Sequence, residues 1–159
     1  IFDNVKNLLH NVRNSLHWSK MNHQEKSVWL ELVANLVVLV GYSAWLLSEL
    51  GKSDLDQIDY KWVLISVFVF HILFSIITQI ILAVVDHRSA NLVDIRDKDI
   101  SRRSNAVGMS IMSAVALVGL GLALFEMPYF AIVHALFYGG LVASLAINTA
   151  KLRYYRVGV

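Results

Sequence analysis

The sequence predicts an all-α polytopic membrane protein, an antiparallel bundle of four transmembrane helices. Hydrophobic residues make up 57% of the 159 residues, which is more than a soluble domain of this size needs for its core. Four apolar runs are each long enough to cross a hydrocarbon layer of about 30 Å as a helix. The basic residues are sorted by membrane side, since only Lys52 and Lys61 of the 14 lie in the connection between the first two spans, while the others lie before the first span, between the second and third, or after the fourth.

The predicted spans are residues 27–48, 62–85, 106–125 and 127–150, within a membrane domain of residues 23–159. Glu31 interrupts the first span, and the other three contain no Asp, Glu, Lys or Arg. A backbone in lipid must satisfy its hydrogen bonds within its own segment, so runs of this length are predicted to be helices and not strands.

Spans three and four are predicted to form a tight hairpin, because only Glu126-Met127-Pro128 connects them. Proline is tolerated at the start of a helix, because an N–H at that position would have no acceptor within the helix. Small residues that allow close backbone approach recur on both spans, every three positions on span three and every four on span four. They are Ser110, Ser113, Ala116 and Gly119 on span three, and Gly140, Ser144 and Asn148 on span four.

The positive-inside rule places the N-terminus, the middle loop and the C-terminus in the cytoplasm, because nearly all lysines and arginines lie in these segments. The predicted location is the inner membrane of a bacterium. The formal net charge of +2 is too small to indicate nucleic-acid binding. The absence of cysteine excludes disulfides, thiolate metal sites and a cysteine nucleophile.

Residues 1–22 are predicted to form an amphipathic helix on the inner leaflet, because apolar residues repeat there at helical spacing. These residues are Ile1, Val5, Leu8, Val12 and Leu16. The alternative is that residues 1–20 dock a protein partner.

The middle loop, residues 86–105, is the most charged part of the chain, and its candidate site residues are Asp94, Arg96, Asp97 and Asp99. Asp94 with Lys98 and Asp99 with Arg103 are acid-before-base pairs four residues apart, which favours a charged helix leading into span three. A different interpretation is that four residues of the loop bind a divalent cation or a phosphate group. These are Asp86, His87, Asp94 and Asp97.

Three stretches resemble a group of small, uncharacterised bacterial four-span membrane proteins. Gln24-Glu25-Lys26-Ser27-Val28-Trp29 looks like their opening, and residues 94–100 look like their acid-Arg-Asp loop, often Asp-Glu-Arg-Asp. Tyr155-Arg156-Val157-Gly158-Val159 looks like their Tyr-Arg-Arg-Gly-hydrophobic ending. Ile95 stands where the glutamate is usual, and Val157 where the second arginine is usual. The resemblance implies four spans and a bacterial source and supplies no mechanism.

Polar residues inside the spans are expensive in lipid and are functional candidates. One predicted layer lies in the cytoplasmic half and consists of Glu31, Asn35, Thr78, Gln79 and Asn148. Glu31 is its only carboxylate and lies near a span end, where pairing with a cytoplasmic Lys or Arg is the simpler interpretation. The alternative is a proton or ion relay through Glu31.

His71 and His134 lie nearer the middle and the outer half of the membrane. Two histidines on different helices of a bundle can bind haem axially or share a metal ion. The alternative is a pair of buried histidines that hydrogen-bond across helices to Tyr42 or Tyr138.

Three classes of function remain open. The first is a non-catalytic subunit or partner-binding module, whose partner would contact residues 1–20 or the 86–105 loop. It is favoured because the sequence has no phosphate-binding glycine loop and no hydrolase or metalloprotease motif. The second is a haem- or metal-binding redox bundle that uses His71 and His134. The third is a small transporter or channel, assembled as a homo-oligomer, with a Glu31 relay.

Overall fold

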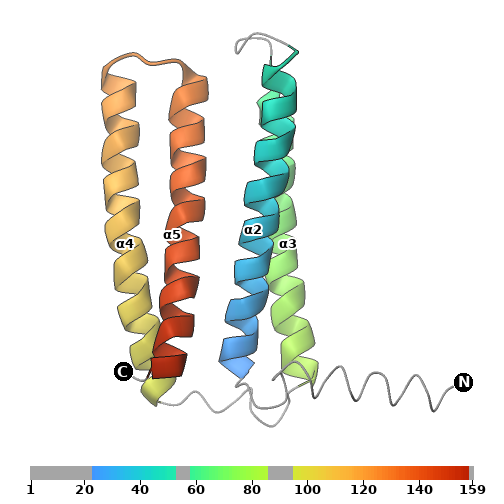
Figure 1. Cartoon of the computed structure of the whole chain (residues 1–159), viewed down its shortest axis with the longest axis vertical. Coiled ribbons are helices and arrows are strands. Elements are labelled where there is room, and N and C mark those ends of the chain that lie inside the picture. The colour runs from blue at the N-terminus through green and yellow to red at the C-terminus, as the bar shows by residue number, and fades with distance from the viewer. Residues whose placement is uncertain (1–22, 53–57, 86–94, 158–159) are drawn as a thin grey trace, which may run out of the picture.

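The computed structural model describes residues 23–52, 58–85 and 95–157 (Figure 1). This part of the chain forms the helices α2 (His23–Leu50), α3 (Tyr60–Val85), α4 (Ile95–Leu124) and α5 (Tyr129–Val157), and it contains no strand. The prediction of an all-α bundle of four helices is therefore confirmed. The predicted amphipathic helix of residues 1–22 lies outside the described residues.

Successive helices run antiparallel and lie side by side in the order α4, α5, α2, α3 (Figure 1). α5 packs against both α4 and α2, whereas α3 packs mainly against α2. We call the end at which α4 joins α5 the hairpin end. The opposite end, where α2 and α4 begin and α3 and α5 finish, we call the basic end.

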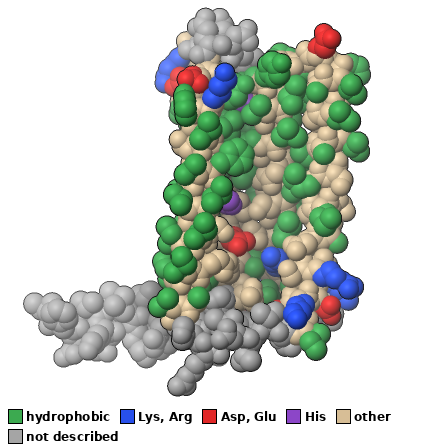
Figure 2. All heavy atoms as spheres, turned by 180° about the vertical axis from the view of Figure 1, so that it is seen from behind, with side chains coloured by type: hydrophobic (Ala, Val, Ile, Leu, Met, Phe, Trp, Pro, Cys, Tyr) green, Lys and Arg blue, Asp and Glu red, His purple; other side chains and the backbone are tan. Residues whose placement is uncertain are grey.

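All four helices are long and apolar enough to cross a membrane. Large apolar side chains are exposed along them, as Figure 2 shows for one face. Exposed apolar surface of this extent would be unstable in water and is the surface that a protein presents to lipid. The protein is a membrane protein.

A Schellman turn closes the hairpin end. The Met127 amide donates to the Leu122 carbonyl at 3.0 Å, and the Glu126 amide donates to the Ala123 carbonyl at 3.1 Å. This turn puts Glu126 in the left-handed region with φ of 53°. Pro128 follows, and its carbonyl accepts from the Ala131 amide at 2.9 Å in the first turn of α5.

Replacing Glu126 with glycine should stabilise the hairpin, because glycine adopts a positive φ without the steric cost that a Cβ brings. The free energy of unfolding should rise by about 0.5 to 1 kcal/mol. Unfolding by SDS in mixed micelles, followed by circular dichroism, measures the change. A loss of stability would show that Glu126 makes a contact that outweighs its backbone strain.

Glycines bring α4 and α5 close together at three places. A Cβ on Gly108, Gly119 or Gly139 would meet a side chain of the opposite helix, Ile147, Leu136 and Val115 respectively. The predicted small-residue stripe on span three is wrong in its members, because Ser110, Ser113 and Ala116 are exposed. Ser110 and Ser113 donate instead to carbonyls of their own helix.

The error has a geometric cause. Residues spaced by three drift around a helix of 3.6 residues per turn, so Ser110 and Gly119 lie on roughly opposite sides of α4. Spacings that alternate between three and four stay on one face. The buried residues Ser104, Gly108 and Gly119 follow that second pattern.

Candidate functional site

A buried polar contact joins α2 to α5. The Tyr42 hydroxyl lies 2.8 Å from His134 Nε2, and both side chains are buried. The other ring nitrogen, His134 Nδ1, lies 2.7 Å from the Phe130 carbonyl oxygen. Because a carbonyl only accepts, Nδ1 carries the proton, and the Nε2 of a neutral ring accepts from the Tyr42 hydroxyl.

Aromatic rings surround His134. Phe130 stacks on it with ring centroids 3.9 Å apart, and Tyr60 of α3 meets it edge-on at 5.1 Å. These contacts fix the orientation of the imidazole ring as well as its tautomer. His134 therefore holds α2, α3 and α5 together near the hairpin end.

Replacing Tyr42 with phenylalanine should leave Nε2 of His134 buried without a partner. The expected loss of stability is about 1 to 3 kcal/mol, the usual cost of a buried polar atom left without a partner. Tyr129→Phe is the matched control, because Tyr129 is 83% exposed and its change should have no effect. Equal SDS midpoints for the two variants would contradict the assigned bond.

Two further bonds tie α2 to α5. Ser43 Oγ lies 3.1 Å from the Tyr138 hydroxyl, and Asn35 Nδ2 donates to Ser144 Oγ at 2.8 Å. Asn35 is 1% exposed, and its Oδ1 has no hydrogen-bond partner within the described ranges. The amide group of Asn35 is thus half satisfied, with its acceptor atom free.

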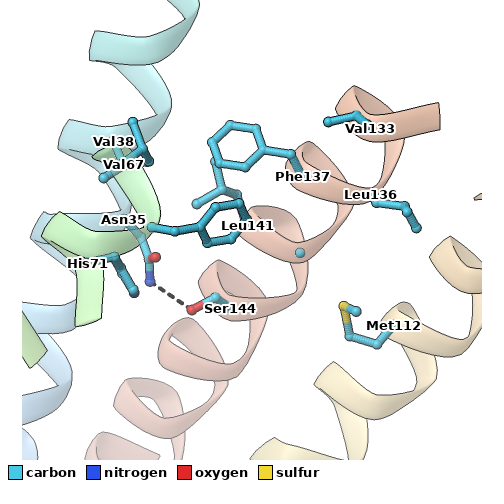
Figure 3. Close-up of a pocket in the computed structure, with 12 residues that line it drawn as sticks. Asn35, Val38, Val67, His71, Met112, Val133, Leu136, Phe137, Leu141 and Ser144 are labelled. Carbon is cyan, nitrogen blue, oxygen red and sulfur yellow. Dashed lines mark hydrogen bonds between the residues drawn. The ribbon is translucent and has the colours of Figure 1, made fainter. Parts of the chain in front are cut away.

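A cavity of about 450 Å³ lies beside this bond. Its walls come from all four helices and are apolar except for Asn35, His71 and Ser144. In Figure 3 the Asn35 and His71 side chains lie together on one side of the cavity, across from Met112. Nδ1 of His71 is buried and has no hydrogen-bond partner among the residues that the structure describes. The cavity therefore has one polar side with two unpaired atoms.

The two histidines proposed as cofactor ligands occupy different surroundings. His71 lines the cavity with Asn35, whereas His134 lies among Tyr42, Tyr60 and Phe130. No hydrogen bond or ring contact joins the two histidines in the part of the chain that the structure describes. Axial ligation of haem by Nε2 of His134 would require breaking the bond to Tyr42.

The residues of the predicted intramembrane layer serve different contacts. Gln79 Nε2 donates to Ser27 Oγ at 2.7 Å and so links α3 to α2. Thr78 and Asn148 are buried, and in the described part of the chain Nδ2 of Asn148 has no hydrogen-bond partner. Glu31 is half-buried and forms no ion pair with another described residue, so the expected pairing with Lys or Arg is not seen within these ranges.

The charged segment before span three is helical from Ile95, as its i, i+4 pairs predict. Asp97 is 7% exposed and hydrogen-bonds to the Tyr155 side chain of α5. Arg96 Nη2 donates to the Tyr155 carbonyl at 3.3 Å. Asp99 is exposed on the other side of the helix. Asp86, His87 and Asp94, the other suggested ligands of a cation, lie outside the described residues.

The guanidinium carbon of Arg156 lies 5.9 Å from the centre of the Trp29 ring, within the range of a cation–π contact. The opening stretch, the acid-Arg-Asp stretch and the ending thus meet at the basic end. Trp29 contributes from α2, Arg96 and Asp97 from α4, and Tyr155 and Arg156 from α5. Described residues from each of the three stretches that carry the resemblance therefore form one cluster of contacts between helices.

For several residues the sequence does not predict the contacts that they make. Ser27 and Ser43 bond across helices, and Phe130 and Tyr60 enclose His134. Isolated serines in apolar runs are a weak signal, since most of them bond to their own helix, as Ser66 does with the Trp62 carbonyl. One signal in the sequence does predict a contact: Phe130 and His134 are spaced i, i+4, which places their rings on the same face of a helix.

Comparison with known proteins gives no further assignment: no protein-family model, no curated protein and no solved structure matches this chain.

Proposed function

We propose that the chain is a non-catalytic membrane module of a bacterial inner membrane, and that its basic end docks a protein partner in the cytoplasm. The positive-inside rule supports this orientation, because lysines and arginines gather at the basic end. The polar contacts of the interior support a structural role, since they tie helix to helix in neutral hydrogen bonds.

The observation that carries the proposal is the charged, helical start of α4, which packs on the bundle through one side. The helix begins at Ile95, whereas its apolar run begins near residue 106, so about 16 Å of helix extends beyond the apolar run. One side of this segment is buried through Asp97, Ile100 and Ser104. The opposite side exposes Lys98, Asp99, Arg102 and Arg103.

A preformed, anchored surface of this kind binds without the entropic cost of ordering a loop. Its exposed side carries three basic residues and one acidic residue, so an acidic protein surface is the complementary partner. An anionic lipid headgroup is the other chemistry that such a surface attracts.

Co-purification from native membranes in mild detergent tests the proposal. We expect a protein at fixed stoichiometry with the wild-type chain, reduced about tenfold by Arg102→Ala combined with Arg103→Ala, a loss of about 1.4 kcal/mol. Lys52→Ala with Lys61→Ala is the matched control at the hairpin end and should leave the partner bound. Deletion of residues 1–20 measures how much the N-terminal segment contributes to partner binding, separately from the two arginines.

Two outcomes would overturn the proposal. In one, no protein accompanies the wild-type chain, and the arginines serve only to bind anionic lipid. In the other, the partner stays bound when both arginines are replaced, which would move the docking surface elsewhere on the chain.

A further inference from the structure

We propose that the cavity beside Asn35 and His71 is a binding site for an amphipathic alcohol that enters from the bilayer. This site is separate from the basic end and does not depend on the docking proposed there. Its evidence is the shape of the cavity, the unpaired atoms on its polar side and the free space at Gly140.

The shape fits a small apolar molecule. The volume of about 450 Å³ is within the range of ligand pockets, roughly 300 to 1,000 Å³. Apolar side chains such as Val67, Met112 and Leu136 form most of the wall. α3 packs mainly on α2, and the molecule is hollowed along the face seen in Figure 2. A molecule dissolved in the bilayer could therefore reach the cavity sideways.

The polar side specifies the chemistry of the head group. Asn35 already donates through Nδ2 to Ser144, so its free Oδ1 requires a hydrogen-bond donor. His71 Nδ1 is the second unpaired atom, and it donates or accepts according to the tautomer of the ring. A hydroxyl group satisfies both, because it donates one hydrogen bond and accepts others. An ether, an ester or a hydrocarbon has no donor for Oδ1.

The unpaired atoms also supply a reason for binding. A buried polar atom without a partner costs about 1 to 3 kcal/mol, and lipid provides no water to relieve it. Asn35 and His71 lie on different helices and line the same cavity, so one hydroxyl can be shared between them. A bound alcohol would recover this cost while its chain fills the apolar part of the cavity.

Gly140 offers a way to close the cavity without disturbing the bundle. It lines the cavity, and no described heavy atom other than those of its chain neighbours and its own helix backbone lies within 4 Å of the position that a Cβ would take. Gly140→Leu should therefore place its side chain in the cavity. Gly41 also has no atom within 4 Å of such a Cβ, and it is not among the lining residues. Gly41→Leu is thus a matched control with the same gain in helix propensity.

The experiment uses two photoactivatable probes in phosphatidylcholine vesicles that contain the full chain. One probe is hexadecanol with a diazirine on its chain, and the other is the methyl ether of the same molecule. The ether keeps the acceptor oxygen and lacks the donor. Mass spectrometry of peptides from α3 and α5 measures labelling at the cavity.

We expect the alcohol to label these peptides about fivefold more than the ether, which corresponds to about 1 kcal/mol. Gly140→Leu should reduce labelling by the alcohol by about fivefold or more, and Gly41→Leu should leave it unchanged. Asn35→Leu should label equally with both probes, because the acceptor is gone.

Equal labelling of the wild-type chain by alcohol and ether would overturn the proposal, even if Gly140→Leu blocks both, because the hydroxyl would then not be recognised. Unchanged labelling in Gly140→Leu would also overturn it. Asn35→Leu loses the bond to Ser144 as well. If that variant does not fold, the comparison of the two probes on the wild-type chain still tests whether the hydroxyl is recognised.

Discussion

Replacing Gly139 with alanine should destabilise the α4–α5 hairpin by about 1 to 3 kcal/mol, the usual cost of overpacking. A Cβ at this position would be driven into the Val115 side chain of α4, within 3.0 Å of its Cβ. Valine is stiff at χ1 and branches at Cβ, so no rotamer removes both of its methyl groups. The two helices would have to separate.

The neighbouring residue supplies the control. Gly140→Ala meets no atom within 4 Å and should stabilise the helix by up to about 1 kcal/mol through helix propensity. Unfolding in SDS mixed micelles should therefore shift in opposite directions for the two variants. Val115→Ala should restore much of the stability lost in Gly139→Ala. A shift of the same sign and size at both glycines would contradict the helix register.

Replacing Ile100 with alanine should have the second large effect. Ile100 is fully buried at 0% exposure, in the charged segment of α4. Truncation of a buried isoleucine removes its packing and leaves a cavity, which costs about 2 to 5 kcal/mol. The segment that carries the exposed basic residues would lose its anchor, and hydrogen exchange in the first turns of α4 should become faster.

Ile95→Ala tests the same chemical change one and a half turns earlier. Ile95 is 78% exposed, so this variant should change stability by less than about 0.5 kcal/mol. Ile100→Ala should also weaken the proposed docking, whereas Ile95→Ala should not. Equal stability of the two variants would show that the charged segment does not pack on the bundle.

Much of the fold follows from the sequence because lipid imposes simple demands. The length of the apolar runs predicts the four helices, and the three-residue connection predicts the α4–α5 hairpin. The acid-before-base spacing indicated that α4 begins well before its apolar run. These features depend on local sequence alone.

The packing between helices could not be predicted from the sequence, because it depends on which helix faces meet. The sequence predicts a stripe of small residues spaced by three on span three. In the structure it is Gly108 and Gly119 that lie against side chains of α5. The bond between Tyr42 and His134 was among the alternatives, and the structure confirms it. The proximity of His71 to Asn35 depends on how α2 and α3 lie relative to each other. The spacing of residues within one helix gives no information about this.

The cluster at the basic end illustrates the same limit. Three short stretches were noted for their resemblance to other membrane proteins, and nothing in their spacing showed that they touch. In the structure Asp97 bonds to Tyr155, and Arg156 lies over Trp29. Their contacts join α2, α4 and α5, so a structural role accounts for these residues without a shared ligand.

The central claim is that the hydrogen bonds of the interior tie helix to helix, and that His71 and His134 do not ligate a cofactor. The absorption spectrum of the detergent-purified protein, with elemental analysis for metals, tests this claim most directly. We predict a colourless protein with no Soret band, because both ring nitrogens of His134 are already bonded. A Soret band that disappears in both His71→Leu and His134→Leu would contradict the account.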